Sequence, residues 1–311
     1  MNPLEFVRAT EKAAIAAARW IGKGDGKAAD KAAVDEMRSH FNKMDFDGKI
    51  VIGEGAKDEA PELFVGEQLG TKQGPAIDIA VDPLECTDSV ANGRPNAIAV
   101  MVTAPRGMLY GAVDSYMEKI AAGPDAAHVI DLNASVMQNV KAVAYALKKS
   151  ASEVTVAVLD RPRHHKLIAD IRNAGARVQL FTDGDVAMAI ATCRPDSPID
   201  LMMGVGGSTE AVLASAALRF YGGEMYCRWQ PDPKHIPRFE AAGFDMPTEF
   251  NRIFRTSDLV RGDDATFTAT GVINGPLLDG VVFRSGKIIT HSLVLSCKQK
   301  TLQEIKSEHF A

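Results

Sequence analysis

One stretch of the chain, residues 78–88, combines residue types that bind metals and phosphates. It reads DIAVDPLECTD, so an apolar run ends in Asp82 and Glu85, and Thr87 follows. Proteins of the α/β class place chemistry at strand ends, and carboxylates spaced in this way suit a hard divalent cation such as Mg²⁺. The stretch therefore indicates a metal-dependent phosphoryl site, with a solvated strand-to-loop turn as the alternative.

Other carboxylates occupy comparable positions. Asp30 lies near the expected start of a helix, Glu54 lies just past a β-branched run, and Glu210 follows a Gly-rich stretch. If these three converge with Asp82 and Glu85, their oxygens supply ligands for two or three octahedral Mg²⁺ or Mn²⁺ sites. Taken singly, each acid is better explained as a solvated surface residue.

Composition limits the class of protein. The chain has 311 residues, of which 46% are hydrophobic and 24% charged, so it forms one large or two closely packed domains. Its formal net charge of -5 argues against nucleic-acid binding. An acidic protein that binds a phosphorylated metabolite needs metal ions and a few placed arginines.

Neither a targeting segment nor a membrane span is indicated. The amino terminus lacks a basic and then apolar signal, and no apolar run reaches the roughly 18 residues of a membrane span. We therefore expect a cytoplasmic protein. The four cysteines lie far apart without a CxxC pair, which predicts free thiols.

Periodicity predicts the elements that position the acids. Ala-rich helical patterns cover 4–21 and 28–41, which places Asp30 in a first helical turn, and strands are expected at 49–52 and 97–103. Strands at 154–159, 177–181 and 200–203 then alternate with helices, which implies βαβ units and a parallel sheet. Residues 228–252 are irregular, and 265–296 are rich in strands.

A soft domain boundary is expected near Ala151. It separates a mixed α+β, metal-binding half (1–150) from a doubly wound α/β half (151–311) that contributes the sugar-phosphate contacts. No linker composition marks the boundary, so we expect the halves to pack tightly.

Several ordered motifs make the chain resemble the class II fructose-1,6-bisphosphatases, over roughly residues 5–309. The matching segments are 53–61 (GEGAKDEAP), 78–87 (DIAVDPLECT), 116–119 (YMEK), 160–164 (DRPRH), 183–186 (DGDV), 204–207 (GVGG), 269–272 (ATGV) and 290–292 (THS). Motifs in this order are far more specific than any one alone.

The resemblance implies a lithium-sensitive-type sugar phosphatase fold with alternating layers of helices and sheets. It implies hydrolysis of the 1-phosphate of fructose 1,6-bisphosphate in gluconeogenesis, with Mn²⁺ or Mg²⁺ bound by Asp30, Glu54, Asp82, Glu85 and Glu210. Thr87 and a carboxylate, Asp30 or Glu54, would then orient and deprotonate the attacking water.

The same resemblance assigns substrate contacts to Glu85, Cys86, Thr87, Tyr116, Arg161, Pro162, Arg163, Asp183, Gly184, Asp185 and Gly207. Two guanidiniums held around a proline suit a second, non-reacting phosphate, although exposed arginines are common. Asp183 and Asp185 suit sugar hydroxyls, with a helix N-cap as the alternative for Asp185. His164 and His165 lack a nucleophile beside them and are expected at the surface or behind the site.

The chain departs from the family pattern at four places. Cys86 replaces a usual glycine, Ala56 a usual glutamate, Lys27 is displaced by one position, and Ala211 replaces another glycine. If the backbone at Cys86 needs a positive φ, the cysteine is strained. Its thiol either makes the enzyme sensitive to oxidation or is simply a small buried side chain.

Two alternatives to a fructose bisphosphatase remain open from the sequence. One is a bifunctional enzyme that also accepts sedoheptulose 1,7-bisphosphate, and the other is a catalytically weak sugar-phosphate sensor. The family resemblance also implies a homodimer or homotetramer, whose partners are small sugar bisphosphates rather than nucleic acid or membrane.

Overall fold

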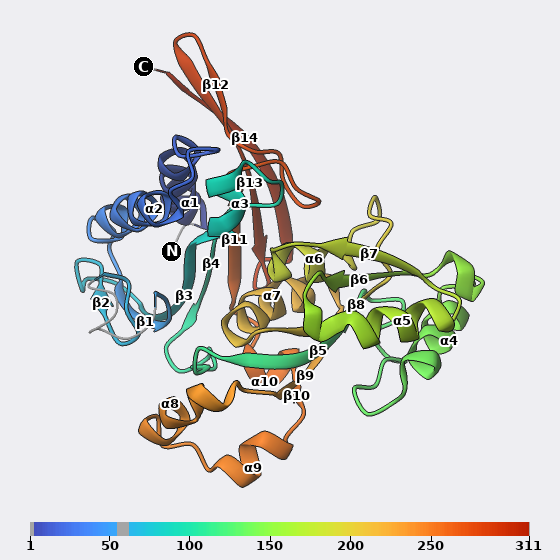
Figure 1. The fold of residues 1–311 in the computed structure, drawn as a ribbon. Coiled ribbons are helices and arrows are strands. Elements are labelled where there is room, and N and C mark those ends of the chain that lie inside the picture. Colours follow the sequence, from blue (N-terminus) through green and yellow to red (C-terminus); the bar gives the residue numbers. More distant parts are fainter. Residues whose placement is uncertain (1–2, 55–61, 311) are drawn as a thin grey trace. The chain divides into compact units, whose positions relative to one another are not determined.

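The chain folds into two compact units (Figure 1). The computed structural model describes residues 3–54 and 62–310. The first unit combines the chain up to Gly111 with the segment from Arg261 onward, and the second runs from Ala112 to Val260. The boundary expected near Ala151 therefore lies inside the second unit, because the strand before it and the strands after it pair in one sheet.

An eight-stranded mixed sheet organises the first unit. Its order is β12-β13-β11-β4-β3-β1-β2, and β14 pairs with β13. The strands are β1 (Asp47–Ile52), β2 (Gln68–Leu69), β3 (Ala76–Glu85), β4 (Ile98–Pro105), β11 (Thr266–Gly271), β12 (Val282–Arg284), β13 (Lys287–Ser296) and β14 (Thr301–Phe310). The strand-rich end of the chain joins this sheet because β11 pairs along the whole of its length with β4. The sequence did not predict β14.

Strand β3 carries the two acids that open the candidate site. It pairs in parallel with β1 and antiparallel with β4, and its register with β4 shifts between Asp82 and Glu85. Asp82 therefore lies inside the strand and Glu85 at its last position, not beyond its end as expected. A bulge of this kind bends the strand and changes the direction of its side chains.

Two helices cover one face of this sheet. The helix α1 (Pro3–Ala18) packs against α2 (Gly26–Phe41), β11 and β13, and both helices contact β3. The Asp25 side chain caps α2 by accepting a hydrogen bond from the amide of Ala28 at 3.0 Å. Because this cap starts the helix at Gly26, Asp30 lies in the second turn rather than the first.

The core between these helices and the sheet is aromatic and aliphatic. Phe46 lies 6.0 Å from Phe6 and 6.2 Å from Phe41, measured between ring centroids, and all three rings are buried. Alanines on the inner face of α1 let the helix approach the sheet closely. The core thus fixes α2 over β3, which carries the acids.

A six-stranded mixed sheet organises the second unit, in the order β10-β9-β5-β8-β6-β7. Its strands are β5 (Tyr116–Ala122), β6 (Thr155–Leu159), β7 (Arg177–Phe181), β8 (Leu201–Gly207), β9 (Glu224–Trp229) and β10 (Phe254–Arg255). The strand β6 pairs in parallel with β7 and β8, as predicted. The remaining pairs are antiparallel, because β5 inserts between β8 and β9.

Helices complete the second unit. They are α4 (Val136–Ala146), α5 (His165–Asn173), α6 (Asp185–Ala191), α7 (Ser208–Tyr221), α8 (Ile236–Ala241), α9 (Met246–Asn251) and α10 (Thr256–Leu259). Residues 228–252, expected to be irregular, form the end of β9 and two short helices around Trp229, whose ring lies 4.7 Å from that of Phe239. The α/β class is confirmed.

Two further expectations can be compared with the described residues. Within 3–54 and 62–310, no helix is long and apolar enough to cross a bilayer. All four cysteines are free thiols, as predicted, and Cys86, Cys193 and Cys227 are buried.

Candidate functional site

The first two acids of the candidate site, Asp82 and Glu85, lie on either side of the register shift near the end of β3. Asp82 is half-buried, and its Oδ1 accepts a hydrogen bond from the amide of Leu84 at 3.0 Å. Glu85 is only 4% exposed. A carboxylate this deeply buried is costly to ionise unless polar or cationic partners compensate it, which is the condition of a metal ligand.

Cys86 adopts the left-handed backbone conformation, with φ 76° and ψ 48°. This is the positive φ at which the family's usual glycine costs nothing and a side chain costs free energy. The residue is the N-cap of α3 (Thr87–Asn92), and its side chain is 6% exposed within the core of the first unit. The positive φ that the sequence analysis made the condition for strain is therefore present, and the thiol belongs to a small buried side chain.

Thr87 is held between β3 and the start of α2. Its Oγ1 donates a hydrogen bond to the carbonyl of Leu84 at 3.1 Å. A Cβ on Gly26 would lie 2.9 Å from the Thr87 Cγ2, so glycine there allows α2 to approach α3. This contact gives a physical reason for Gly26 at the place where the lysine pattern is displaced.

The remaining acids of the first unit, Asp30 and Glu54, lie on elements that neighbour β3. Ile52 pairs with Ala80, so Glu54, two residues after β1, lies beside the stretch of β3 that contains Asp82. Asp30 lies on α2, which packs against β3 and α3. Burial raises the pKa of its carboxyl above the ordinary value.

The donor set is suited to hard cations, because every predicted ligand offers carboxylate oxygen. Among residues 3–54 and 62–310, however, no group of three or more His, Cys, Asp or Glu side chains is placed to hold a metal ion. The structure thus puts four predicted ligands on adjacent elements of the first unit and the fifth, Glu210, in the second. Ala56, where the family usually has a second glutamate, lies outside the described residues.

A buried ion pair lies among the predicted substrate residues of the second unit. Lys119 on β5 is 2% exposed, and its Nζ lies 2.8 Å from the Oδ2 of Asp185, the first residue of α6. Burial alone lowers the pKa of Lys119, but the nearby carboxylates of Asp185 and Glu210 raise it on balance, so the ammonium stays charged. Gly184, not Asp185, is the N-cap of α6, so the N-cap alternative for Asp185 is wrong.

Two glycines at the end of β8 make room for carboxylates. A Cβ on Gly206 would lie 1.7 Å from the Asp185 Oδ2, and one on Gly207 would lie 1.9 Å from the Glu210 Oε2. Any side chain at either position would displace an acid. The absence of side chains at Gly206 and Gly207 therefore allows the carboxylates of Asp185 and Glu210 to lie against the end of β8.

Glu210 lies in the first turn of α7, where the helix dipole favours a negative charge. Its Oε2 accepts a hydrogen bond from the Thr209 hydroxyl at 2.8 Å. Burial raises the pKa of the Glu210 carboxyl, and the positive charge of Lys119 opposes that effect. Lys119 thus acts on two of the predicted site acids.

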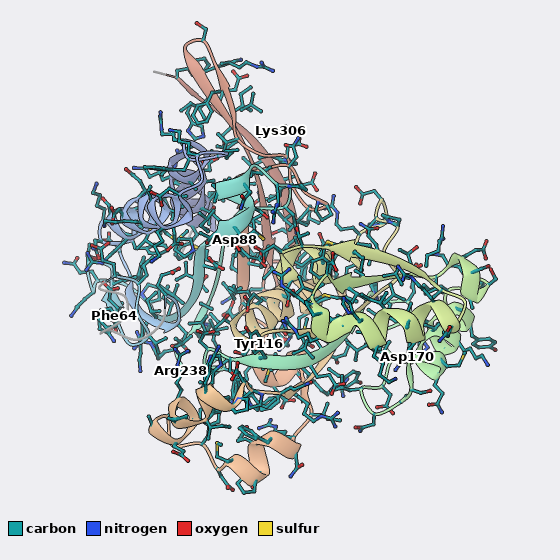
Figure 2. The ribbon with its side chains drawn as sticks, in the orientation of Figure 1. Phe64, Asp88, Tyr116, Asp170, Arg238 and Lys306 are labelled. Carbon is teal, nitrogen blue, oxygen red and sulfur yellow. The ribbon has the colours of Figure 1, made fainter. Side chains whose placement is uncertain are left out.

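Tyr116 and Arg163, two predicted substrate residues, contact each other. The Arg163 guanidinium lies 5.2 Å from the centroid of the Tyr116 ring and donates hydrogen bonds of 3.2 and 2.8 Å to the carbonyl of Val205. Figure 2 marks Tyr116 on β5. Arg161 instead donates to the carbonyl of Asp160 at 3.0 Å, and its backbone is extended, as a following Pro162 requires.

His164 has a structural role. It is 2% exposed, its Nδ1 lies 2.6 Å from the carbonyl of Leu159, and its Nε2 accepts a hydrogen bond from the amide of Val205 at 2.8 Å. These partners require the neutral ring with the proton on Nδ1, and burial lowers its pKa accordingly. Of the two positions expected for the histidines, at the surface or behind the site, the surface is excluded for His164, while His165 is exposed.

Sequence reasoning missed the role of Lys119. The sequence did carry a sign of it. Lys119 stands directly before the apolar end of a strand that is buried there, and an unpaired lysine is rarely buried. Asp183 is half-buried and precedes Gly184, whose φ of 96° needs glycine.

A family model and individual relatives both match this chain over nearly its whole length. Residues 2–309 match the model of the bacterial fructose-1,6-bisphosphatases encoded by glpX. Fructose-1,6-bisphosphatase 1 class 2 of Escherichia coli (strain K12) is 42% identical over 317 residues, which cover 99% of this chain and 94% of the relative. The class 2 enzyme of Shigella flexneri gives the same values.

Among solved structures, the extragenic suppressor protein SuhB from Bartonella henselae matches with 15% identity and a TM-score of 0.30, covering 61% of this chain and 71% of its own. So low a TM-score supports no conclusion about the fold. The sequence matches are sufficient without it: the chain belongs to the family of bacterial class 2 fructose-1,6-bisphosphatases encoded by glpX.

Proposed function

We propose that this protein hydrolyses the 1-phosphate of fructose 1,6-bisphosphate, releasing fructose 6-phosphate and inorganic phosphate. The observation that carries the proposal is family membership over residues 2–309, in a chain that keeps every predicted ligand carboxylate. The buried Glu85 of β3 suits a cation ligand, and the Lys119 ammonium beside Asp185 supplies a positive charge in the second unit.

The proposed cofactor is Mn²⁺ or Mg²⁺, held by Asp30, Glu54, Asp82, Glu85 and Glu210. Oxygen-only donors and a buried Glu85 fit such cations. When bound, a divalent cation lowers the pKa of water and neutralises charge on the attacking and leaving oxygens of phosphoryl transfer.

Thr87 and a neighbouring carboxylate position the attacking water in this proposal. The Thr87 hydroxyl donates its hydrogen bond to the carbonyl of Leu84, so its oxygen can still accept a hydrogen bond from water. Asp30 and Glu54, carboxylates on elements that neighbour β3, are the two candidates for the proton acceptor.

The second unit is proposed to bind the rest of the substrate. Arg161 and Arg163, with Pro162 between them, take the 6-phosphate, since guanidiniums pair with phosphate oxygens in two-point hydrogen bonds. The sugar itself is contacted in this proposal by five residues: Tyr116, Asp183, Gly184, Asp185 and Gly207. Asp185 can serve only through the oxygen that Lys119 leaves accessible.

Phosphate release from three substrates tests the proposal. With Mn²⁺, we expect enzyme-like turnover of fructose 1,6-bisphosphate, and turnover of sedoheptulose 1,7-bisphosphate identifies a bifunctional enzyme. Activity on inositol monophosphate alone would contradict the proposal, because that substrate has no second phosphate for Arg161 and Arg163 to bind.

Substitutions separate an enzyme from a sugar-phosphate sensor. Glu54→Ala and Asp82→Ala should each lower kcat by at least about 100-fold, because each removes a direct oxygen ligand. Asp88→Ala is the matched control, since Asp88 is an exposed acid in the same segment. Loss of turnover in the control as well, or in neither ligand variant, would refute the assigned site.

A further inference from the structure

The backbone of Glu54, a proposed cation ligand, is held by the segment 63–67, which pairs with β1. The Glu54 amide donates a hydrogen bond of 3.0 Å to the carbonyl of Leu63. A Cβ on Gly53, the residue before it, would lie 2.0 Å from the same carbonyl oxygen, so this close approach needs glycine. The position of the Glu54 backbone therefore depends on the position of Leu63.

Leu63 has an unusual backbone conformation, with a φ of 54°. This left-handed conformation costs free energy in a residue that has a side chain. The Leu63 side chain is fully buried in the core of the first unit, and its amide donates a hydrogen bond to the Oε2 of Glu67. The core on one side and the Glu67 carboxylate on the other thus hold Leu63 in place against its own preference.

Glu67 is itself buried and paired. It is 7% exposed, and its Oε1 accepts a hydrogen bond of 2.7 Å from the Nε of Arg38. A buried carboxylate needs partners of this kind to stay ionised. Arg38 lies on α2, the helix that also carries Asp30. The ion pair therefore connects the helix of one proposed cation ligand to the segment that holds another.

We propose that Glu67, held by Arg38, is a positioning residue for the cation site. It acts through the backbone of Leu63 on Glu54, and it sets the place from which the Glu54 carboxylate reaches a divalent cation. Groups behind the ligands of a metal site commonly fix the orientation of those ligands. The inference rests on the proposed function in one respect, which is that Glu54 binds the cation.

The contacts of Glu67 distinguish this role from that of a sixth ligand. One carboxylate oxygen accepts from Arg38 and the other from the amide of Leu63. A cation at either oxygen would have to displace the arginine or release Leu63 from its left-handed conformation. Glu67 therefore acts on the cation only through Glu54.

Mn²⁺ affinity tests the proposal, measured by calorimetric titration of the metal-free full chain. Glu67→Ala should weaken Mn²⁺ binding at least about tenfold, the size typical of a group that orients a metal ligand. In the Glu54→Ala background, where the remaining ligands bind Mn²⁺ more weakly, adding Glu67→Ala should cause no further loss. Such non-additivity identifies an effect that passes through Glu54.

Two arginine variants give a matched comparison that does not depend on Glu54→Ala. The side chains of Arg38 and Arg106 are 35% and 34% exposed, and each pairs with a buried acid, Glu67 and Asp78 respectively. Arg38→Met should weaken Mn²⁺ binding, although less than Glu67→Ala does, because the carboxylate still holds Leu63. Arg106→Met removes a similar ion pair that does not reach Glu54, and it should bind Mn²⁺ as the wild type does.

Three results would overturn the proposal in variants that circular dichroism shows to be folded. They are an unchanged affinity in Glu67→Ala, an equal loss with and without Glu54, and equal effects of Arg38→Met and Arg106→Met. A wild-type chain that binds no Mn²⁺ would refute the cation site and this inference together. If the expected pattern of Mn²⁺ affinities holds but fructose 1,6-bisphosphate is not hydrolysed, the proposed function fails and the positioning role of Glu67 stands.

Discussion

At the scale of single residues, Cys86 is the most distinctive feature of the site. Its left-handed backbone is imposed by the turn from β3 into α3, where the register with β4 has just shifted. The chain keeps this geometry although a side chain is present. A side chain at a positive φ is strained, so we expect the departure from the family pattern to cost stability.

We predict that Cys86→Gly is more stable than Cys86→Ala by about 1 kcal/mol, because both variants remove the thiol but only glycine relieves the left-handed strain. Urea denaturation of the two variants measures the difference. Equal stabilities would show that the backbone at this position is not strained.

Asp30 and Glu210 also act as single residues, through their protonation. Burial raises both pKa values above the ordinary 3.8 and 4.5, so the folded protein binds protons that the unfolded chain has released. Without metal, stability falls as the pH rises from those ordinary values through the raised ones. A bound cation removes this cost, because it stabilises the ionised carboxylates.

The melting temperature should therefore rise more on adding Mn²⁺ at pH 7 than at pH 5, where protons compete with the cation. Thermal unfolding at the two pH values, with a monovalent salt of equal ionic strength as control, measures the difference. An equal rise at both values, or none at pH 7, would contradict a metal site built from these acids.

At the scale of elements, β5, β8 and α6 of the second unit position the buried ion pair of Lys119 and Asp185. The pairing of β5 with β8 places Lys119 opposite Gly204, and Gly206, two residues further along β8, leaves space for Asp185 at the start of α6. One buried ion pair thus fixes the end of a helix against two strands. Removing one partner alone would leave an uncompensated buried charge.

Lys119→Met should accordingly lower the free energy of unfolding by about 3 kcal/mol, and adding Asp185→Asn should recover part of that loss because no lone charge remains. Urea denaturation of both single variants and the double variant gives the coupling. Lys298→Met, at an exposed lysine, serves as control. A double variant as unstable as the sum of the single effects would refute the coupling.

The sequence predicted elements well where burial follows a regular period. The Ala-rich periodicity located α1 and α2, and β-branched runs located β1, β6 and β7. It missed β14, because a strand exposed on both faces has no apolar alternation. It shortened β8, because the glycines at 204–207 resemble a loop until pairing with β5 holds them in the sheet.

At the scale of the whole molecule, the chain leaves its first unit at Gly111 and returns to it at Arg261. This path could not be predicted from local sequence, since it depends on β11 pairing with β4 more than 160 positions away. The acids and arginines of the site could be named from motifs. Their contacts, such as Arg163 with Tyr116, required the folded structure.

The proposed division of labour gives the first unit the reacting phosphate and the second unit the sugar and its other phosphate. It accounts for the buried Glu85 near Thr87 in one unit and for arginines, a tyrosine and a buried lysine in the other. The identity of the released phosphate tests this division most directly.

That measurement is the identification of the sugar product from fructose 1,6-bisphosphate and Mn²⁺, by an enzymatic assay coupled specifically to fructose 6-phosphate. The account predicts one equivalent of fructose 6-phosphate for each phosphate released, and no fructose 1-phosphate. Release of the 6-phosphate, or no release by the folded and metal-loaded protein, would contradict it.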